Sequence, residues 1–387
     1  MKDFVEFPRT RPIGIFVHHQ GRGHAERVAA LANAIPHDRP VRIFCARDDI
    51  FPTLREGVSI TTIPSLFERP EGEVAEMDWV PTPQTLHCAP LGWQTIRQSM
   101  AMLTDWFFHA DPAVMIVDVS AEVAQLARIC SVPHVKVVQH GDRIDPGHRA
   151  AYDGAAGLLG PFHAALAQPC WDEDMRARMY FAPGLGVSVT MPSHEEARRR
   201  LGICNSRKLA VVVTGGGGNG LSEAPLGVAA RTFPEIDWVV LGKVQRDWHA
   251  TLPANLRLMG WVENADDWIA ASDLVIASTG NTTCHQILAA GRPWIAVPEW
   301  RYFDEQLCKA EALAAAGAAL HLPHLPGSAH RWREAVTRVL STHDPSRQRR
   351  LAGDPDAAPR AAAWIESLIA RLWDPATATT SLQRMPS

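Results

Sequence analysis

Residues 272–297 read Ser-Asp-Leu-Val-Ile-Ala-Ser-Thr-Gly-Asn-Thr-Thr-Cys-His-Gln-Ile-Leu-Ala-Ala-Gly-Arg-Pro-Trp-Ile-Ala-Val. Leu274–Ala277 is a short apolar run with β-branched residues, which is typical of a buried parallel strand. The small and hydroxyl-bearing residues after it suit a tight turn into a helix over Cys284–Ala290, which we expect to end at Gly291. A second apolar strand, Trp294–Val297, follows. The stretch therefore predicts a strand–helix–strand unit of an α/β fold.

The turn between this strand and this helix is a candidate phosphate site. It contains Gly280, Thr282 and Thr283. A helix N-terminus presents free backbone N–H groups and the positive end of the helix dipole to an anion. The alternative is a plain helix cap in an ordinary α/β repeat.

The wider spacing of residues in this region favours the phosphate site. The pattern consists of Gly280, Thr282, Thr283, Gln286, Gly291, Pro293, Pro298, Asp304, Gln306 and Gly317. It resembles the donor-sugar signature of GT-B fold glycosyltransferases, in particular the peptidoglycan N-acetylglucosaminyltransferase and UDP-glycosyltransferase families.

The resemblance implies roles for several of these residues. In the signature an acidic residue before the helix-ending glycine binds the ribose hydroxyls, and here that position is Gln286. A glutamine carbonyl can accept one hydroxyl hydrogen bond, but a neutral group accepts it less strongly than a carboxylate. The resemblance also implies that Asp304, Glu305 and Gln306 bind hydroxyls of the donor sugar. The alternative for these three is a solvated loop.

A second glycine-rich turn follows the predicted strand Leu209–Val213. It contains Gly215, Gly216, Gly217, Gly218 and Asn219. Glycines let the backbone approach a ligand closely, although a merely flexible turn is the alternative. The lysine of a P-loop is absent, and Lys243 stands near the position where a dinucleotide fold requires an acid, which disfavours NAD. The resemblance implies that this loop meets the donor diphosphate, while Trp261 and Val262 border the base of the nucleotide.

The third signal is Gly21-Arg22-Gly23-His24, directly after a predicted first strand at Ile13–His18. It resembles the glycine–histidine loop of the first GT-B domain, on the acceptor side of the cleft. A histidine there can take a proton from an acceptor hydroxyl. The alternative is that His24 only caps or orients the loop. Reserve candidates for the base lie at other predicted strand ends of the same domain: Asp118, His140 and Asp142.

Strands alternating with helices along the chain indicate two parallel sheets. We expect the α/β GT-B architecture, two doubly wound Rossmann-like domains facing a central cleft. The first domain is placed at residues 1–190, with an irregular connection over 161–186, and the second at 191–355. A terminal helix over 356–373 is expected to cross back to the first domain, and residues 374–387 to be disordered.

Composition narrows the classes of partner. The chain has 387 residues with a net charge of −4, which gives no support for a nucleic-acid partner. Its seven cysteines are dispersed, which favours reduced thiols in the cytoplasm. No apolar stretch approaches the roughly 18 residues of a membrane span, although peripheral membrane contact stays compatible with the sequence.

The expected function is transfer of a sugar from a nucleotide diphosphate donor, with UDP favoured, to an acceptor hydroxyl. We expect inversion at the sugar carbon and no cofactor beyond the nucleotide sugar. We also expect no metal, because Asp172-Glu173-Asp174 looks like a helix start rather than a metal motif. The alternatives are a UDP-sugar hydrolase or epimerase of the same fold, and a non-catalytic nucleotide-sugar-binding subunit.

Overall fold

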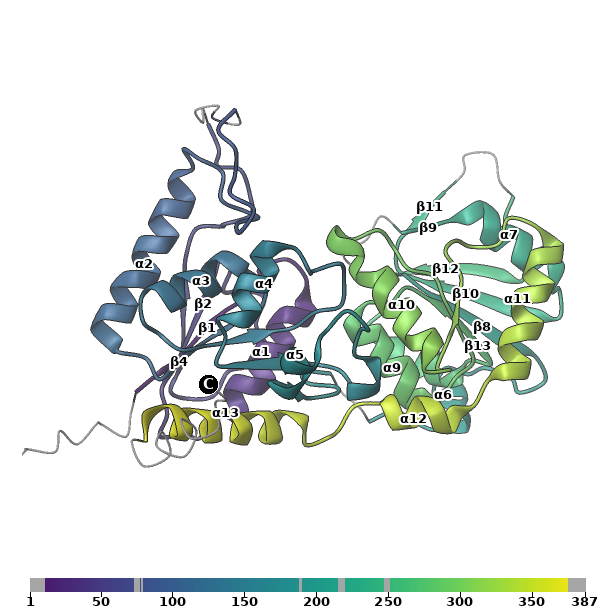
Figure 1. Cartoon of the computed structure of the whole chain (residues 1–387). Helices are drawn as coiled ribbons and strands as arrows, with labels where there is room; N and C mark the ends of the chain where they lie inside the picture. The colour runs from purple at the N-terminus through teal and green to yellow at the C-terminus, as the bar shows by residue number, and fades with distance from the viewer. Residues whose placement is uncertain are drawn as a thin grey trace, which may run out of the picture.

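The structure is a computed structural model that describes residues 11–72, 77, 79–187, 190–214, 220–246 and 251–374. Two α/β domains lie side by side, and the terminal helix runs beneath the first of them (Figure 1). The expected tail over 375–387 lies outside the described residues.

The first domain contains a seven-stranded parallel sheet in the order β3-β2-β1-β4-β5-β6-β7. Its strands are β1 (Ile13–Phe16), β2 (Val41–Cys45), β3 (Val58–Thr62), β4 (Val114–Val117), β5 (His134–Val137), β6 (Gly157–Gly160) and β7 (Met179–Phe181). Its helices are α1 (Arg22–Ala34), α2 (Gln94–Ala110), α3 (Ala121–Ile129), α4 (Pro146–Asp153), the 3-10 turn η1 (Ala164–Leu166) and α5 (Glu173–Ala177). Buried apolar clusters cover both faces of the sheet, which explains why β1 and β4 are buried along their whole length.

One part of this domain differs from expectation. The region 161–186, expected to be irregular, contains α5 and β7, and β6 and α4 lie just before it. The prediction was wrong because β6 reads Gly-Leu-Leu-Gly and β7 reads Met-Tyr-Phe, so neither contains the β-branched residues that mark a buried strand. The expected helix start at Asp172 is confirmed, since its side chain accepts a hydrogen bond from the N–H of Met175 at 2.8 Å.

The second domain contains a six-stranded parallel sheet in the order β12-β10-β8-β13-β14-β15. Its strands are β8 (Lys208–Val213), β10 (Ile236–Leu241), β12 (Leu256–Gly260), β13 (Leu274–Ala277), β14 (Trp294–Ala296) and β15 (Leu320–His321). A small separate pair is formed by β9 (Leu221–Ser222) and β11 (Val244–Gln245). The helices are α6 (His194–Arg200), α7 (Glu223–Thr232), α8 (Ala265–Ala271), α9 (Asn281–Ala290), η2 (Tyr302–Asp304), α10 (Glu305–Ala315), α11 (Ala329–Thr342) and α12 (Pro345–Leu351).

The strand orders fix where ligands can bind. In each sheet the order reverses at one point, between β1 and β4 in the first domain and between β8 and β13 in the second. The paired strands are in register, with Phe16 opposite Val117 and Val213 opposite Ala277. Open α/β sheets bind ligands beyond the carboxyl ends of the strands at such a reversal. The predicted loops at 21–24, 215–219 and 278–283 follow three of these strands in the sequence, β1, β8 and β13, and Asp118 follows β4 directly.

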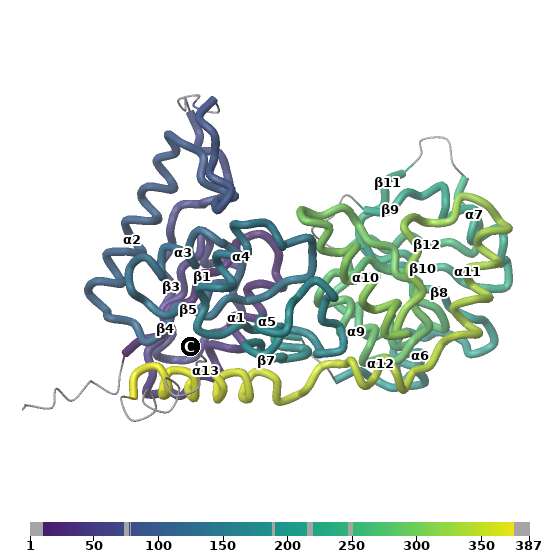
Figure 2. Tube along the Cα trace, in the orientation of Figure 1, coloured from purple at the N-terminus to yellow at the C-terminus, as the bar shows by residue number. Residues whose placement is uncertain are grey.

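Helix α13 (Ala357–Trp373) returns to the first domain, as the continuous tube in Figure 2 shows. Its indole Nε1 at Trp373 donates to the carbonyl oxygen of Ala113 at 2.9 Å, and Glu366 forms an ion pair with Arg39 at 2.7 Å. One buried apolar cluster also contains residues of both domains, for example Phe162 and Cys284. The two sheets are therefore held by the terminal helix and by direct contact. No described helix has the length and apolar character needed to cross a membrane.

Candidate active site

The ends of β1 and β4 bring together two residues that are far apart in sequence. Nδ1 of His24, in the first turn of α1, is hydrogen-bonded to the carboxylate of Asp118, which follows β4. The Asp118 side chain is 0% exposed, whereas that of His24 is 23% exposed. Arg27, one turn further along α1, places Nη2 at 2.5 Å from the other Asp118 oxygen. The base candidate His24 and the reserve candidate Asp118 thus form one pair.

The charges of this pair assign its protons. Burial alone would raise the pKa of Asp118, but the Arg27 guanidinium and His24 outweigh burial and hold that pKa well below its usual range. Asp118 is therefore a carboxylate, which can only accept hydrogen bonds. His24 must donate to it from Nδ1–H, so in the neutral ring Nε2 keeps its lone pair. The described residues give Nε2 no hydrogen-bond partner.

The glycine–histidine loop faces the predicted phosphate turn across the two domains. A Cβ atom added to Gly23 would lie 3.4 Å from Oγ1 of Thr282, at the start of α9. Gly280 caps α9 without a side-chain hydrogen bond, and Gly291 ends the helix with φ of 64°. The first N–H groups of a helix have no partner within the helix. The free end of α9 therefore points to the same region as His24.

Lys309 adds a positive charge beside this helix end. Its Nζ donates to the side-chain oxygen of Asn281 at 3.3 Å, and the residue is largely buried. The sequence analysis did not identify Lys309, which lies 28 residues beyond Asn281 on α10. Lys309 stands at helical spacing from Ala310 and Leu313, and a lysine on this apolar face was the signal that could have indicated it.

Gln286 lies on α9 beside an acidic residue of α8. Its amide Nε2 donates to Oδ1 of Asp266 at 2.5 Å. Burial and the neighbouring Asp267 raise the pKa of Asp266 above its usual value, and the opposing effect of the hydrogen bond from Gln286 is smaller. A carboxylate is therefore present next to the neutral residue of the signature, although it comes from a different element.

The segment after β14 separates into residues with different environments. Gln306 is buried, and its Oε1 accepts hydrogen bonds from the N–H groups of Thr279 at 3.3 Å and Glu299 at 2.8 Å. Glu305 instead reaches Arg143 of the first domain at 3.4 Å. Asp304 is exposed, with φ of 51°, a left-handed conformation that is rare outside glycine. Gln306 thus braces the ends of β13 and β14, and Glu305 connects the domains.

The two other reserve candidates for the base, His140 and Asp142, lie apart from the His24–Asp118 pair in different environments. His140 is buried against Phe162 and Trp171, and burial lowers its pKa to about 3. Its Nε2 is 2.8 Å from the carbonyl oxygen of Leu166, which is a core environment. Asp142 is exposed and donates its N–H to the carbonyl oxygen of Phe303 at 2.6 Å.

Of the residues expected to border the nucleotide base and the diphosphate, the structure describes some and not others. Trp261 is exposed and Val262 is half-buried, in the loop between β12 and α8. The exposed Arg22 lies 3.9 Å from Glu26. Gly215, Gly216, Gly217, Gly218 and Asn219 lie outside the described residues.

An open groove of about 670 Å³ lies next to Gly21 at the carboxyl edge of the first sheet. Several of its lining side chains are polar or charged, namely His19, Gln20, Arg47, Thr62, Ser65, Glu68 and Gln98. The groove adjoins the glycine–histidine loop and offers hydrogen bonds along its length.

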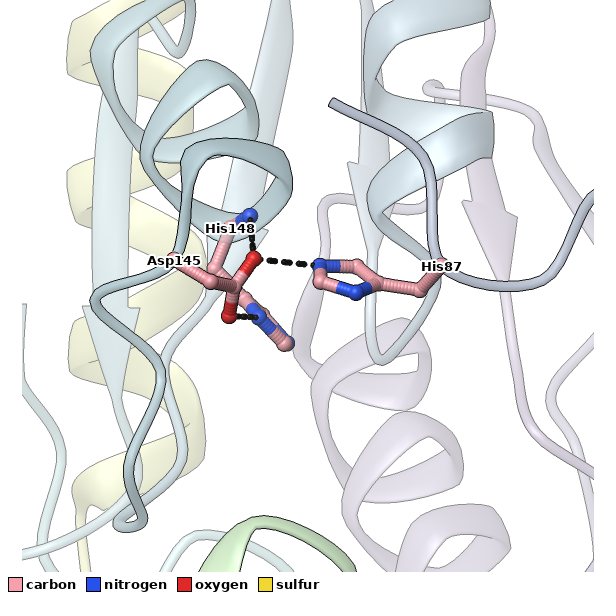
Figure 3. Close-up of side chains that lie close together, drawn as sticks. All are labelled: His87, Asp145 and His148. Carbon is pink, nitrogen blue, oxygen red and sulfur yellow. Dashed lines mark hydrogen bonds and ion pairs between the residues drawn. The ribbon is translucent and has the colours of Figure 1, made fainter. Parts of the chain in front are cut away.

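A separate cluster joins His87, Asp145 and His148 (Figure 3). Asp145 caps α4, and its carboxylate lies 2.8 Å from Nε2 of His87 and 2.6 Å from Nδ1 of His148. Nη1 of Arg143, which can only donate, lies 3.1 Å from Nε2 of His148. Nδ1 of His148 must then carry the proton, so it is not free to bind a metal. Hydrogen bonding accounts for this cluster.

Comparison with known proteins is consistent with this geometry. Residues 240–357 match the family described as Glycosyltransferase family 28 C-terminal domain. A curated relative from Rhizobium etli is UDP-N-acetylglucosamine–N-acetylmuramyl-(pentapeptide) pyrophosphoryl-undecaprenol N-acetylglucosamine transferase. It is 35% identical over 107 residues, which are 26% of this chain and 29% of that protein. The match therefore spans less than a third of the relative.

Solved structures resemble the whole chain. MurG of Acinetobacter baumannii aligns with a TM-score of 0.61 at 13% identity, covering 92% of this chain and 99% of that one. A UDP-glucosyltransferase from Polygonum tinctorium gives 0.63 at 14% identity, covering 94% and 99%. The spinosyn rhamnosyltransferase bound to thymidine diphosphate gives 0.59 at 18% identity, covering 92% and 99%. The chain therefore has the GT-B fold that its donor signature implied, and its residues 240–357 are similar to the C-terminal domain of glycosyltransferase family 28.

Proposed function

We propose that this protein transfers a sugar from a nucleoside diphosphate, with UDP favoured, to an acceptor hydroxyl. The observation that carries the proposal is the placement of the His24–Asp118 pair opposite the free end of α9. These two features lie at the strand-order reversals of the two sheets, where α/β folds bind ligands. A proton acceptor therefore faces an anion site across the domain boundary.

The reaction follows from these groups. The acceptor oxygen attacks the anomeric carbon while Nε2 of His24 takes the hydroxyl proton, and Asp118 stabilises the resulting imidazolium. The bond from the anomeric carbon to the diphosphate breaks on the opposite side, so the configuration inverts. The N–H groups of α9 and the ammonium of Lys309 stabilise the negative charge on the departing diphosphate. These groups supply the stabilisation that a metal gives elsewhere, so we expect no metal requirement.

The identity of the nucleotide and the nature of the acceptor are proposed from the comparisons and from the groove. UDP is favoured because the relative from Rhizobium etli uses a UDP-linked sugar, while the thymidine diphosphate in the spinosyn enzyme keeps TDP as the next nucleotide to test. We assign Trp261 and Val262 to the nucleotide base, and the glycine turn at 215–219, which lies outside the described residues, to the diphosphate. The polar groove beside Gly21 suits an acceptor with several hydrogen-bonding groups. Action in the cytoplasm, with or without peripheral membrane contact, is part of this proposal.

Product analysis tests the reaction. The protein is incubated with each nucleotide sugar and a library of hydroxyl acceptors, and the products are identified by mass spectrometry. We expect a glycoside and free UDP. Free sugar plus UDP would instead indicate a hydrolase, an isomerised nucleotide sugar an epimerase, and no product a binding subunit.

The variant His24→Ala tests the mechanism within that assay. Loss of a general base should lower turnover about 100- to 10,000-fold. The wild-type rate should rise with pH as the imidazole loses its proton, and this rise should disappear in the variant. Asp142→Asn is run beside it to test a reserve candidate for the base, and we expect near-normal turnover because Asp142 is exposed and its N–H donates to the carbonyl oxygen of Phe303. Near-normal turnover in His24→Ala would pass the role of base to another residue.

A further inference from the structure

Arg27 is a buried cation inside the His24–Asp118 pair. It lies three residues after His24 on α1, so the two side chains share one face of the helix. The residue is only 5% exposed. Its Nη2 lies 2.5 Å from Oδ1 of Asp118 and 2.9 Å from Nδ1 of His24, and its buried Nε has no hydrogen-bond partner among the described residues.

The contact between Arg27 and His24 cannot be an ordinary hydrogen bond. A guanidinium only donates, and Nδ1 of His24 uses its proton toward Asp118. Two donors therefore approach the same carboxylate and lie next to each other. When His24 takes up a proton at Nε2, a second positive charge forms beside a guanidinium that is always charged. Arg27 thus opposes protonation of His24, while Asp118 favours it.

Other titratable groups surround this trio from several elements. Lys136 on β5 donates to the carbonyl oxygen of Asp118 at 3.1 Å, and burial lowers its pKa to about 7 although Asp118 raises it. The ring of His18, after β1, has its centroid 5.9 Å from that of His24, and burial lowers its pKa to about 4. His285 on α9 is buried, which lowers its pKa to about 4. Both histidines are therefore neutral at pH 7.

His19 and Glu68 lie further out and face each other at 2.9 Å. The Glu68 carboxylate therefore lies beside the His19 ring and balances a positive charge on that ring when the ring is protonated. Among the groups that the structure describes, Arg27 is therefore a permanent cation that contacts both members of the pair.

We propose that Arg27 is a positioning residue that keeps Asp118 ionised, fixes the Nδ1–H tautomer of His24 and restrains His24 from protonation. This inference rests on the proposed role of His24 as base and adds the group that sets its charge. Its consequence is that His24 keeps a free Nε2 lone pair at lower pH than the histidine–aspartate pair would alone.

The sign of the effect is set by charge. In Arg27→Met the carboxylate of Asp118 is no longer balanced by the guanidinium, so it attracts the imidazolium form of His24 more strongly. The titration of His24 should then move to higher pH. In Arg27→Lys the charge stays, so the titration should remain near that of the wild type.

The test follows the histidine ring signals by NMR in protein labelled at its histidines. The His24 signal is identified by its absence in His24→Gln, and its titration is compared in the wild type, Arg27→Met and Arg27→Lys. We expect the midpoint in Arg27→Met to rise by about one pH unit or more, the size of effect that a close charge exerts. Arg198→Met is the matched control, because it removes a buried arginine that pairs with Asp273 at 3.1 Å in the second domain. It should leave the His24 titration unchanged.

A titration in folded Arg27→Met that does not move, or moves to lower pH, overturns the proposal and leaves Arg27 a packing residue. If Arg27→Met does not fold, Arg27→Gln gives the same test, because its neutral amide can still donate to Asp118. The NMR result does not depend on turnover, so it decides the role of Arg27 even if no sugar transfer is found. Where transfer is found, the rise of rate with pH should move upward by the same interval in Arg27→Met.

Discussion

Gln286 and Asp266 together provide one carboxylate and one amide at the side of α9. The amide donates to the carboxylate, which orients both side chains. If this place borders the ribose, Asp266 can accept the hydroxyl hydrogen bonds for which a neutral Gln286 is poorly suited. The exchange in the signature would then be compensated by a residue of α8, which no local pattern around Gln286 reveals.

This pair reverses an expectation from the sequence. From the sequence alone, Gln286→Glu should be tolerated or should tighten UDP binding. In the structure the new carboxylate would meet Asp266 at hydrogen-bond distance, and two close carboxylates cannot both stay ionised. We therefore expect Gln286→Glu to weaken UDP binding roughly tenfold, the cost of one lost hydrogen bond.

The double variant is the control for this prediction. Gln286→Glu with Asp266→Asn restores one carboxylate and one amide in exchanged places, so UDP affinity should return toward that of the wild type. Binding is measured by calorimetry. Equal affinities in the wild type, Gln286→Glu and Gln286→Leu would place this pair away from the ribose.

At the scale of elements, α9 and the strands around it were predicted well. The bounds of β13 and the ending of the helix at Gly291 agree with the sequence, because an apolar run and a left-handed glycine are local signals. The helix itself begins at Asn281, three residues earlier than expected. The strands β6 and β7 were missed because their burial comes from pairing within the sheet, not from a local pattern.

The same contrast applies to the site. The loop at Gly21–His24 was visible in the sequence because glycines and a histidine follow a strand. The contact of His24 with Asp118 spans 94 residues, and Lys309 reaches Asn281 from another helix. Such contacts arise from the strand order, so the sequence could name candidates without pairing them.

The first turn of α9 gives a prediction at this scale. Thr283→Val removes a hydroxyl at the helix end and should weaken diphosphate binding by about 1–3 kcal/mol. Thr232→Val is a matched control, because that hydroxyl donates to the carbonyl oxygen of Val228 within α7. The dissociation constants of UDP for both variants are measured by calorimetry. The assignment of α9 fails if Thr283→Val and Gly216→Val both bind every nucleoside diphosphate as the wild type does.

At the scale of the whole molecule, buried histidines connect stability to pH. Nε2 of His285 lies 3.2 Å from the carbonyl oxygen of Pro161, so this side chain joins α9 to the first domain. Burial lowers the pKa of His285 to about 4 and that of His140 to about 3. Between these values and the unfolded value near 6.5, the unfolded chain binds more protons than the folded one.

Stability should therefore fall as pH falls from about 6.5 toward 4, by up to about 1.4 kcal/mol per pH unit for each such histidine. Urea unfolding at pH 7 and at pH 5 measures this change. His285→Gln keeps a donor for Pro161 but does not titrate, so its stability should depend less on pH. If the free energy of unfolding of His285→Gln depends on pH as steeply as that of the wild type, His285 does not contribute to the pH dependence.

The proposed function requires the second domain to hold a nucleoside diphosphate opposite His24. Calorimetric titration of UDP into the wild-type protein and into His24→Ala tests it most directly. We expect one binding site with similar affinity in both proteins, because the donor is held by α9 and its neighbours and not by the base. No binding of UDP, TDP or GDP to the wild type, or binding that is lost in His24→Ala and kept in Thr283→Val, would contradict the claim.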